Sequence, residues 1–120
     1  MDISVKIAIT APDGVVHQHE IAAFETGCDI AAEIGLSISA SKALLLSLQQ
    51  EIVAAQTAAF CADYSTCSCC AGRLRRKGSK AIQYRTVFGD IIIDSPRFYH
   101  CRCHAGSAQT FSPLTELLPH

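Results

Sequence analysis

The chain has 120 residues, of which 49% are hydrophobic, a mean hydropathy of +0.24 and a formal net charge of −1. These values exclude a largely disordered chain and are typical of one globular domain or two small modules. No window contains 18 consecutive apolar residues, so we expect no membrane partner. The start MDISVKIAIT lacks the charged beginning and unbroken apolar run of a secretory signal, and we therefore expect a cytoplasmic protein.

Charge divides the chain into two parts. Residues 1–66 carry eight acidic side chains against two lysines, whereas residues 67–120 carry eight basic side chains against three acids. The two parts therefore favour different surroundings. We divide the chain into an acidic part, 1–66, and a basic part, 67–120.

The acidic part begins with a pattern typical of a β-hairpin. Ile3, Val5, Ile7 and Ile9 alternate with less apolar residues, as in a strand with one buried face. The residues APDG at 11–14 favour a turn, because proline fixes one dihedral and glycine accepts positive φ. A return strand is expected over residues 15–24.

A long helix is expected from about Ser39 to Asp63, because this stretch lacks Gly and Pro and follows two serines, Ser37 and Ser39, that can cap it. Its apolar residues form two neighbouring seams. The first seam contains Leu45, Leu48, Ile52, Ala55 and Ala59, and the second contains Leu46, Val53 and Phe60. Such a wide arc has two explanations: a single core that contacts the helix from both sides, or a homodimer through the helix 39–63.

The chain contains seven cysteines, which in a cytosolic protein favour metal binding or redox chemistry over disulfides. Four of them form C-x-x-C and C-x-C pairs, namely Cys67, Cys70, Cys101 and Cys103. Four thiolates suit one structural zinc ion in a closed tetrahedral site.

The ligand set has alternatives. Cys69 lies inside the first pair, and His100 and His104 flank the second pair, so any of them could replace one cysteine. We expect Cys28 and Cys61 to be small buried hydrophobic residues. A redox role is the weaker explanation, because a thioredoxin-type pair opens a helix, whereas Cys67 follows one.

The segments AIQYRTVFG and DIIIDSPRFYH between the cysteine pairs are rich in strand formers. They are too short to bury a core alone, so metal binding is expected to supply folding free energy. The predicted fold is therefore α+β: an N-terminal β-hairpin, one long amphipathic helix, and a small zinc-ribbon-like antiparallel β module.

Basic side chains are concentrated in GRLRRKGSK at 72–80 and continue along the predicted strands. They are Arg73, Arg75, Arg76, Lys77, Lys80, Arg85, Arg97 and Arg102. Such a run on a small β-scaffold favours contacts with phosphates, and we expect DNA as the partner. A module that binds an acidic protein is the alternative, and a thiol redox protein is a distant third.

Three motifs in one order make a family resemblance specific. The run YRTVFGDIIIDSPRFYHCRC at 84–103, the upstream C-x-x-C followed by basic residues, and FSPLTELLP at 111–119 closely resemble the N-terminal region of ISKra-type insertion-sequence transposases. The resemblance covers nearly the whole chain and implies a zinc-binding, DNA-recognising region. It departs from the family pattern at Ala71, where the family has glycine directly after the cysteine pair.

No catalytic residue is expected in this chain. Members of the family continue after the L-L-P motif into a nuclease-like domain with metal-binding carboxylates, whereas this sequence stops at His120. Two-metal phosphoryl transfer needs several converging carboxylates, and the basic part offers only Asp90, Asp94 and Glu116. The resemblance thus implies a truncated or split transposase that recognises DNA but is not an enzyme by itself.

Overall fold

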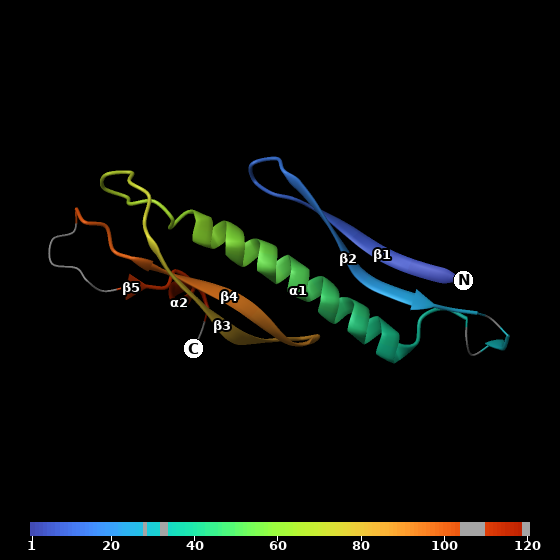
Figure 1. Cartoon of the computed structure of the whole chain (residues 1–120). Coiled ribbons are helices and arrows are strands. Elements are labelled where there is room, and N and C mark those ends of the chain that lie inside the picture. The colour runs from blue at the N-terminus through green and yellow to red at the C-terminus, as the bar shows by residue number, and fades with distance from the viewer. Residues whose placement is uncertain (28, 32–33, 104–109, 119–120) are drawn as a thin grey trace. The chain divides into compact units, whose positions relative to one another are not determined.

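The computed structural model describes residues 1–27, 29–31, 34–103 and 110–118 (Figure 1). Its elements are β1 (Asp2–Thr10), β2 (Val16–Glu25), α1 (Ile38–Ala62), β3 (Arg76–Thr86), β4 (Gly89–Tyr99), β5 (Thr110–Phe111) and α2 (Leu114–Leu117). A hairpin, one long helix and a small antiparallel sheet follow one another, which confirms the predicted α+β fold. No helix in the described part of the chain is long and apolar enough to cross a membrane.

The chain forms two compact units. The first unit consists of Met1–Ala55 and Arg85–Ile91, and the second unit of Gln56–Tyr84 and Ile92–His120. Both units therefore contain part of α1 and part of the β3–β4 hairpin. The division into parts 1–66 and 67–120, which rests on charge, remains a prediction.

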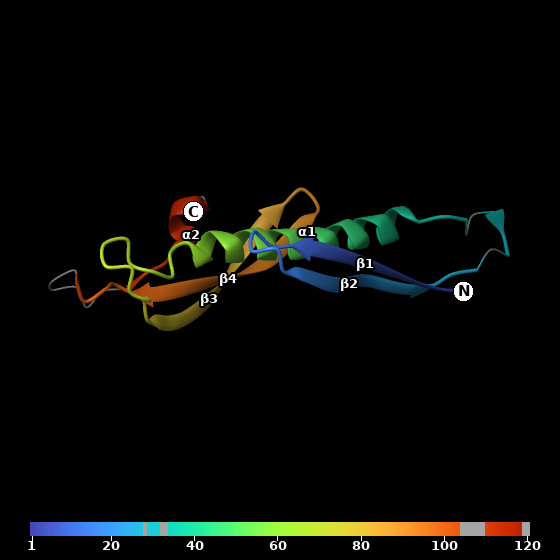
Figure 2. The ribbon, with the colours of Figure 1, turned by 90° about the horizontal axis from the view of Figure 1, so that it is seen from above.

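In the first unit, β1 and β2 pair antiparallel and run alongside the first part of α1 (Figures 1 and 2). The alternating exposure of β1 confirms that one face of this strand is turned inward. A register shift at Val5/Lys6 interrupts the ladder, where β2 contributes the additional residue Ile21. His19 Nδ1 lies 3.5 Å from Glu51 Oε2 of α1.

The helix α1 begins as expected, because the Ser37 hydroxyl accepts a hydrogen bond from the Ala40 N–H at 3.1 Å. Leu46, from the second predicted seam, lies beside the β3–β4 turn, where a Cβ added to Gly89 would meet it at 3.2 Å. Gly89 also has φ 129°, so this position requires glycine for two reasons. On the first predicted seam, Leu45 and Ile52 remain 38% and 37% exposed.

The strands β3, β4 and β5 form a sheet in that order, and in the second unit β5 pairs with the end of β4 through Phe98 and Tyr99. The core of this unit contains Ile93, which is 1% exposed, and Leu114, which is 0% exposed. The thiol of Cys61 is buried, as predicted, and burial, followed by the Asp94 carboxylate, raises its pKa. Cys28 and His104 lie outside the described residues.

Candidate metal centre

The β3–β4 hairpin brings the two cysteine pairs together. Strands joined by the two residues Val87 and Phe88 are antiparallel, so the start of β3 and the end of β4 lie at the same end of the sheet. A hydrogen bond of 2.9 Å from the Tyr99 N–H to the Arg75 carbonyl fixes this end. The C-x-x-C pair precedes β3 and the C-x-C pair follows β4, and both therefore arrive at one place.

The first pair lies in a tight turn held by backbone hydrogen bonds. The Cys67 N–H donates to the Gly72 carbonyl at 2.8 Å, and the Ala71 N–H donates to the Cys67 carbonyl at 3.0 Å. The Cys69 N–H donates to Cys67 Sγ at 3.4 Å. These contacts turn the sulfurs of the pair to one side, and backbone N–H groups stabilise negative charge on a thiolate.

The four predicted ligands converge. Cys67 Sγ lies 3.4 Å from Cys103 Sγ, and Cys70 Sγ lies 3.4 Å from Cys101 Sγ. All four sulfurs lie within 4.8 Å of one another. A tetrahedral site with metal–sulfur bonds of about 2.3 Å places its sulfurs about 3.8 Å apart, which falls inside the observed range. The cluster can therefore hold one metal ion with four sulfur ligands.

The electrostatic environments of Cys67, Cys70 and Cys103 differ. N–H donors from Cys70 and Cys69, followed by the thiol of Cys103, lower the pKa of Cys67 to about 5. The pKa of Cys103 is raised, first through its contact with Cys67. The Gly72 N–H lowers the pKa of Cys70, but its contacts with Cys101 and Cys67 together raise this pKa further, so the net direction is upward. The backbone N–H groups of the turn therefore favour the thiolate form of Cys67.

The other predicted ligands lie elsewhere or outside the described residues. Cys69 is exposed and contributes its backbone N–H rather than its thiol to the centre. The ring of His100 lies 4.9 Å from that of Phe111 and does not belong to the cluster. Among the described residues, the cluster consists of the four cysteines alone.

Ala71 is strained in the turn. It has φ 58°, the left-handed conformation that L-residues other than glycine adopt at a cost of about 1–2 kcal/mol. The next residue, Gly72, is glycine for a different reason. A Cβ at this position would approach Cys70 Sγ to 3.2 Å. The sequence therefore has alanine at a position whose conformation favours glycine.

Ala71→Gly is expected to stabilise the metal-loaded protein by about 1 kcal/mol, because it relieves this strain. Thermal denaturation of the metal-loaded chain would measure the gain as a rise in Tm of several degrees. Ala81→Gly is the control: Ala81 lies in β3 without positive φ, and glycine there is expected to lower Tm. Equal shifts of the same sign in both variants would contradict the strain at residue 71.

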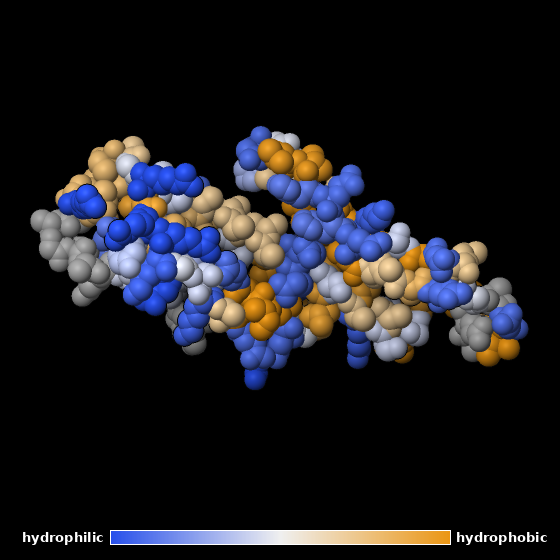
Figure 3. All heavy atoms as spheres, viewed as in Figure 1, coloured by the Kyte–Doolittle hydropathy of each residue, from blue (hydrophilic) through white to orange (hydrophobic). Residues whose placement is uncertain are grey.

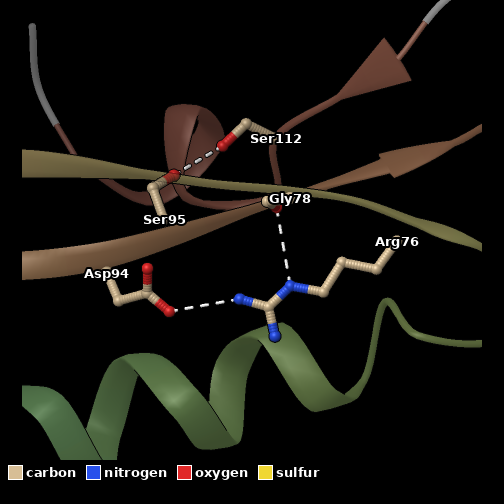
Figure 4. Close-up of polar contacts among 5 residues, drawn as sticks. All are labelled: Arg76, Gly78, Asp94, Ser95 and Ser112. Carbon is tan, nitrogen blue, oxygen red and sulfur yellow. Dashed lines mark hydrogen bonds and ion pairs between the residues drawn. The ribbon is translucent and has the colours of Figure 1, made fainter.

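The basic side chains fall into distinct settings. Arg75 Cζ lies 4.5 Å and Lys77 Nζ 6.0 Å from the centre of the Tyr99 ring, so both cations lie over the same aromatic ring. Arg76 instead donates to Asp94 at 3.2 Å and to the Gly78 carbonyl (Figure 4). The predicted segment 72–80 is thus partly strand, because β3 begins at Arg76.

The remaining predicted DNA contacts are exposed. They are Arg73, Lys80, Arg85, Arg97 and Arg102. The backbone of Arg73 forms an isolated β-bridge with Thr66 beside the cysteine turn. The side chain of Arg97 donates a hydrogen bond to the Thr110 hydroxyl at 2.7 Å. Figure 3 shows hydrophilic side chains gathered over β3 and β4 on the face that it presents.

Comparison with models of protein families, with curated proteins and with solved structures found no match to this chain.

Proposed function

We propose that the chain is a zinc-stapled DNA-binding module that serves as the N-terminal, DNA-recognising part of a transposase and does not catalyse transposition itself. The observation that carries the proposal is the convergence of four cysteine sulfurs within 4.8 Å at the end of a small, basic sheet. The order of the YRTVFG, SPRFYHCRC and FSPLTELLP motifs supports the transposase context.

Zinc is the metal that this ligand set favours. Four thiolates form a soft, closed site that leaves no position for water, which is the arrangement of structural zinc rather than of catalytic zinc. The thiol pair also follows α1 instead of opening a helix, which favours metal binding over thiol redox chemistry. In this function the ion holds the two ends of the β3–β4 hairpin together.

Arg75 and Lys77 are the strongest candidates for phosphate contacts. Their positions over the Tyr99 ring limit the conformations of two otherwise flexible side chains, so less entropy is lost on binding. A stacked guanidinium keeps the N–H groups at its edge available for phosphate oxygens. Arg76 is a weaker candidate because Asp94 already neutralises its charge.

The salt dependence of duplex binding tests this function. The slope of log affinity against log salt is about −0.9 for each neutralised phosphate, so Arg75→Gln with Lys77→Gln should flatten it by nearly two units. Fluorescence anisotropy of a labelled duplex over a salt series measures the slope. Random duplex DNA should bind with a Kd of roughly 10⁻⁵ M near physiological salt.

Arg76→Gln is the matched control, since it removes the same charge from the neighbouring position but from a residue with a carboxylate partner. It should change the slope by less than half as much as Arg75→Gln does. If the double variant retains zinc and shows the same salt slope as the unmodified protein, these two cations contact water and not phosphates. The protein-interaction module would then become the leading function.

A further inference from the structure

The second unit contains a groove of about 770 Å³ whose lining comes from β3, β4, β5, Ser112 and the helix α2. Two cations, Lys80 and Arg97, line it, and none of its lining residues is an aspartate or glutamate. Among the described residues, no carboxylate forms an ion pair with the two cations of the groove.

Hydroxyl groups add hydrogen-bond donors to this charge. Thr110 Oγ1 accepts from Arg97 Nη2 at 2.7 Å, which leaves its own hydrogen to donate elsewhere. The hydroxyls of Ser95 and Ser112 lie 2.7 Å apart (Figure 4), and this contact uses only one of their two hydrogens. Ser95 is 2% exposed, so its hydroxyl is fixed in place by packing.

The groove also has an apolar part. Ile82 and Phe111 belong to its lining. The ring of Phe111 is tilted against Phe98, with 6.0 Å between the ring centres, and against His100, with 4.9 Å. An aromatic side chain supported in this way offers a surface for a flat ring, and stacking of a base on such a ring is worth about 1–3 kcal/mol in single-strand complexes.

Its size limits the ligand. A volume of about 770 Å³ lies within the usual range for small-molecule sites, about 300–1,000 Å³. A duplex does not enter such a hollow, because the major groove of a duplex is by itself about 12 Å wide. A single nucleotide unit combines the required features: an anionic phosphate and a flat ring.

We propose that this groove binds a nucleoside phosphate as one unit of a single DNA strand. Lys80, Arg97 and the neighbouring hydroxyls bind the phosphate, and the base packs against Phe111 and Ile82. The choice of a nucleic acid strand rests on the DNA-binding function proposed above, whereas the nucleoside phosphate itself follows from the groove. The chain would thus contact duplex DNA through Arg75 and Lys77 and an unpaired strand through the groove.

The test is binding of short oligothymidylate to the zinc-loaded full chain, measured by fluorescence anisotropy. Lys80→Gln combined with Arg97→Gln should weaken this binding by about a hundredfold or more, because two charged hydrogen-bond donors are lost. The slope against log salt should flatten by about 0.7, because both cations bind one phosphate and each neutralised phosphate on a single strand contributes about 0.7. Lys42→Gln removes an exposed lysine of α1 outside the groove and should leave both values unchanged.

Two further variants guard against loss of folding. Lys80→Gln alone changes an exposed side chain of β3 and should weaken binding by itself. Arg97→Lys keeps the charge and should restore most of the affinity lost in Arg97→Gln. Unchanged oligothymidylate binding in the double variant, with zinc content intact, would overturn the groove site.

The remaining measurements separate this proposal from the proposed function. If duplex binding depends on Arg75 and Lys77 but oligothymidylate binding does not depend on Lys80 and Arg97, the groove proposal is overturned and the duplex-binding function stands. Strand binding that requires Lys80 and Arg97 in a chain without duplex binding would support the groove and overturn the duplex function. Thymidine monophosphate is then added as a competitor of the oligonucleotide. If it displaces the oligonucleotide at concentrations near the oligonucleotide's Kd, the groove binds free nucleotides, and its assignment to a DNA strand is overturned.

Discussion

Removal of the metal is expected to unfold the chain from Cys67 onward while leaving helical signal from α1. The sheet of the second unit is small, and among its strands β5 consists of two residues, Thr110–Phe111. Structural zinc contributes about 10–16 kcal/mol of apparent binding free energy in small zinc modules, which is folding free energy when the site forms only in the folded state. Circular dichroism during titration with a chelator would show the loss, and elemental analysis should give one zinc per chain before it.

Two cysteine variants sharpen this experiment. Cys103→Ser removes one of the four converging sulfurs and should greatly weaken zinc retention. Cys69→Ser changes an exposed thiol two residues after Cys67 and keeps the N–H that donates to Cys67 Sγ, so zinc should be retained. Equal loss in the two variants, or full retention in both, would contradict the four-cysteine assignment.

The sequence predicted the ligand set because spacing and topology agree. A C-x-x-C pair before one strand and a C-x-C pair after the next strand meet when the two strands form a hairpin. The spacing alone did not decide whether Cys69 or His100 would replace a cysteine. That depends on the turn, which directs the backbone N–H of Cys69 to Cys67 Sγ, and on Phe111, whose ring packs beside His100.

The roles of individual basic residues could not be predicted. In the sequence, Arg75, Arg76 and Lys77 are three consecutive basic residues that nothing distinguishes. In a strand, however, side chains alternate between the two faces. Arg75 and Lys77 therefore lie over Tyr99, whereas Arg76 pairs with Asp94, 18 positions further along the chain. The contact between Ser95 and Ser112 was missed for a different reason: it joins two segments that have no local sequence pattern in common.

The helix shows a second limit of pattern reasoning. Its periodicity indicated two apolar seams but not what covers them, and Leu45 and Ile52 prove to be partly exposed. Leu46 contacts Gly89, the glycine of the YRTVFG motif, which lies 43 positions away in the sequence. That contact depends on the tertiary position of the β3–β4 turn, so helical periodicity could not reveal it. A homodimer through residues 39–63 remains a prediction.

The FSPLTELLP motif offers a test of how the core of the second unit is built. Leu114 is 0% exposed, whereas Leu117, on the same short helix α2, is 47% exposed. Truncation of a buried leucine to alanine costs about 2–5 kcal/mol, because apolar contacts are lost and a cavity remains. The same change at an exposed position costs far less, typically within about 0.5 kcal/mol.

Leu114→Ala is therefore expected to lower the Tm of the zinc-loaded chain by about 10 °C or more, since each kcal/mol shifts a domain of this size by about 4–8 °C. Leu117→Ala should lower it by no more than a few degrees. Differential scanning calorimetry of both variants at equal zinc occupancy measures the contrast. Because Leu114 is not a metal ligand, Leu114→Ala should still bind one zinc per chain at low temperature. Similar losses in the two variants would mean that α2 does not anchor the core through Leu114, and the FSPLTELLP segment would then need a role at the surface.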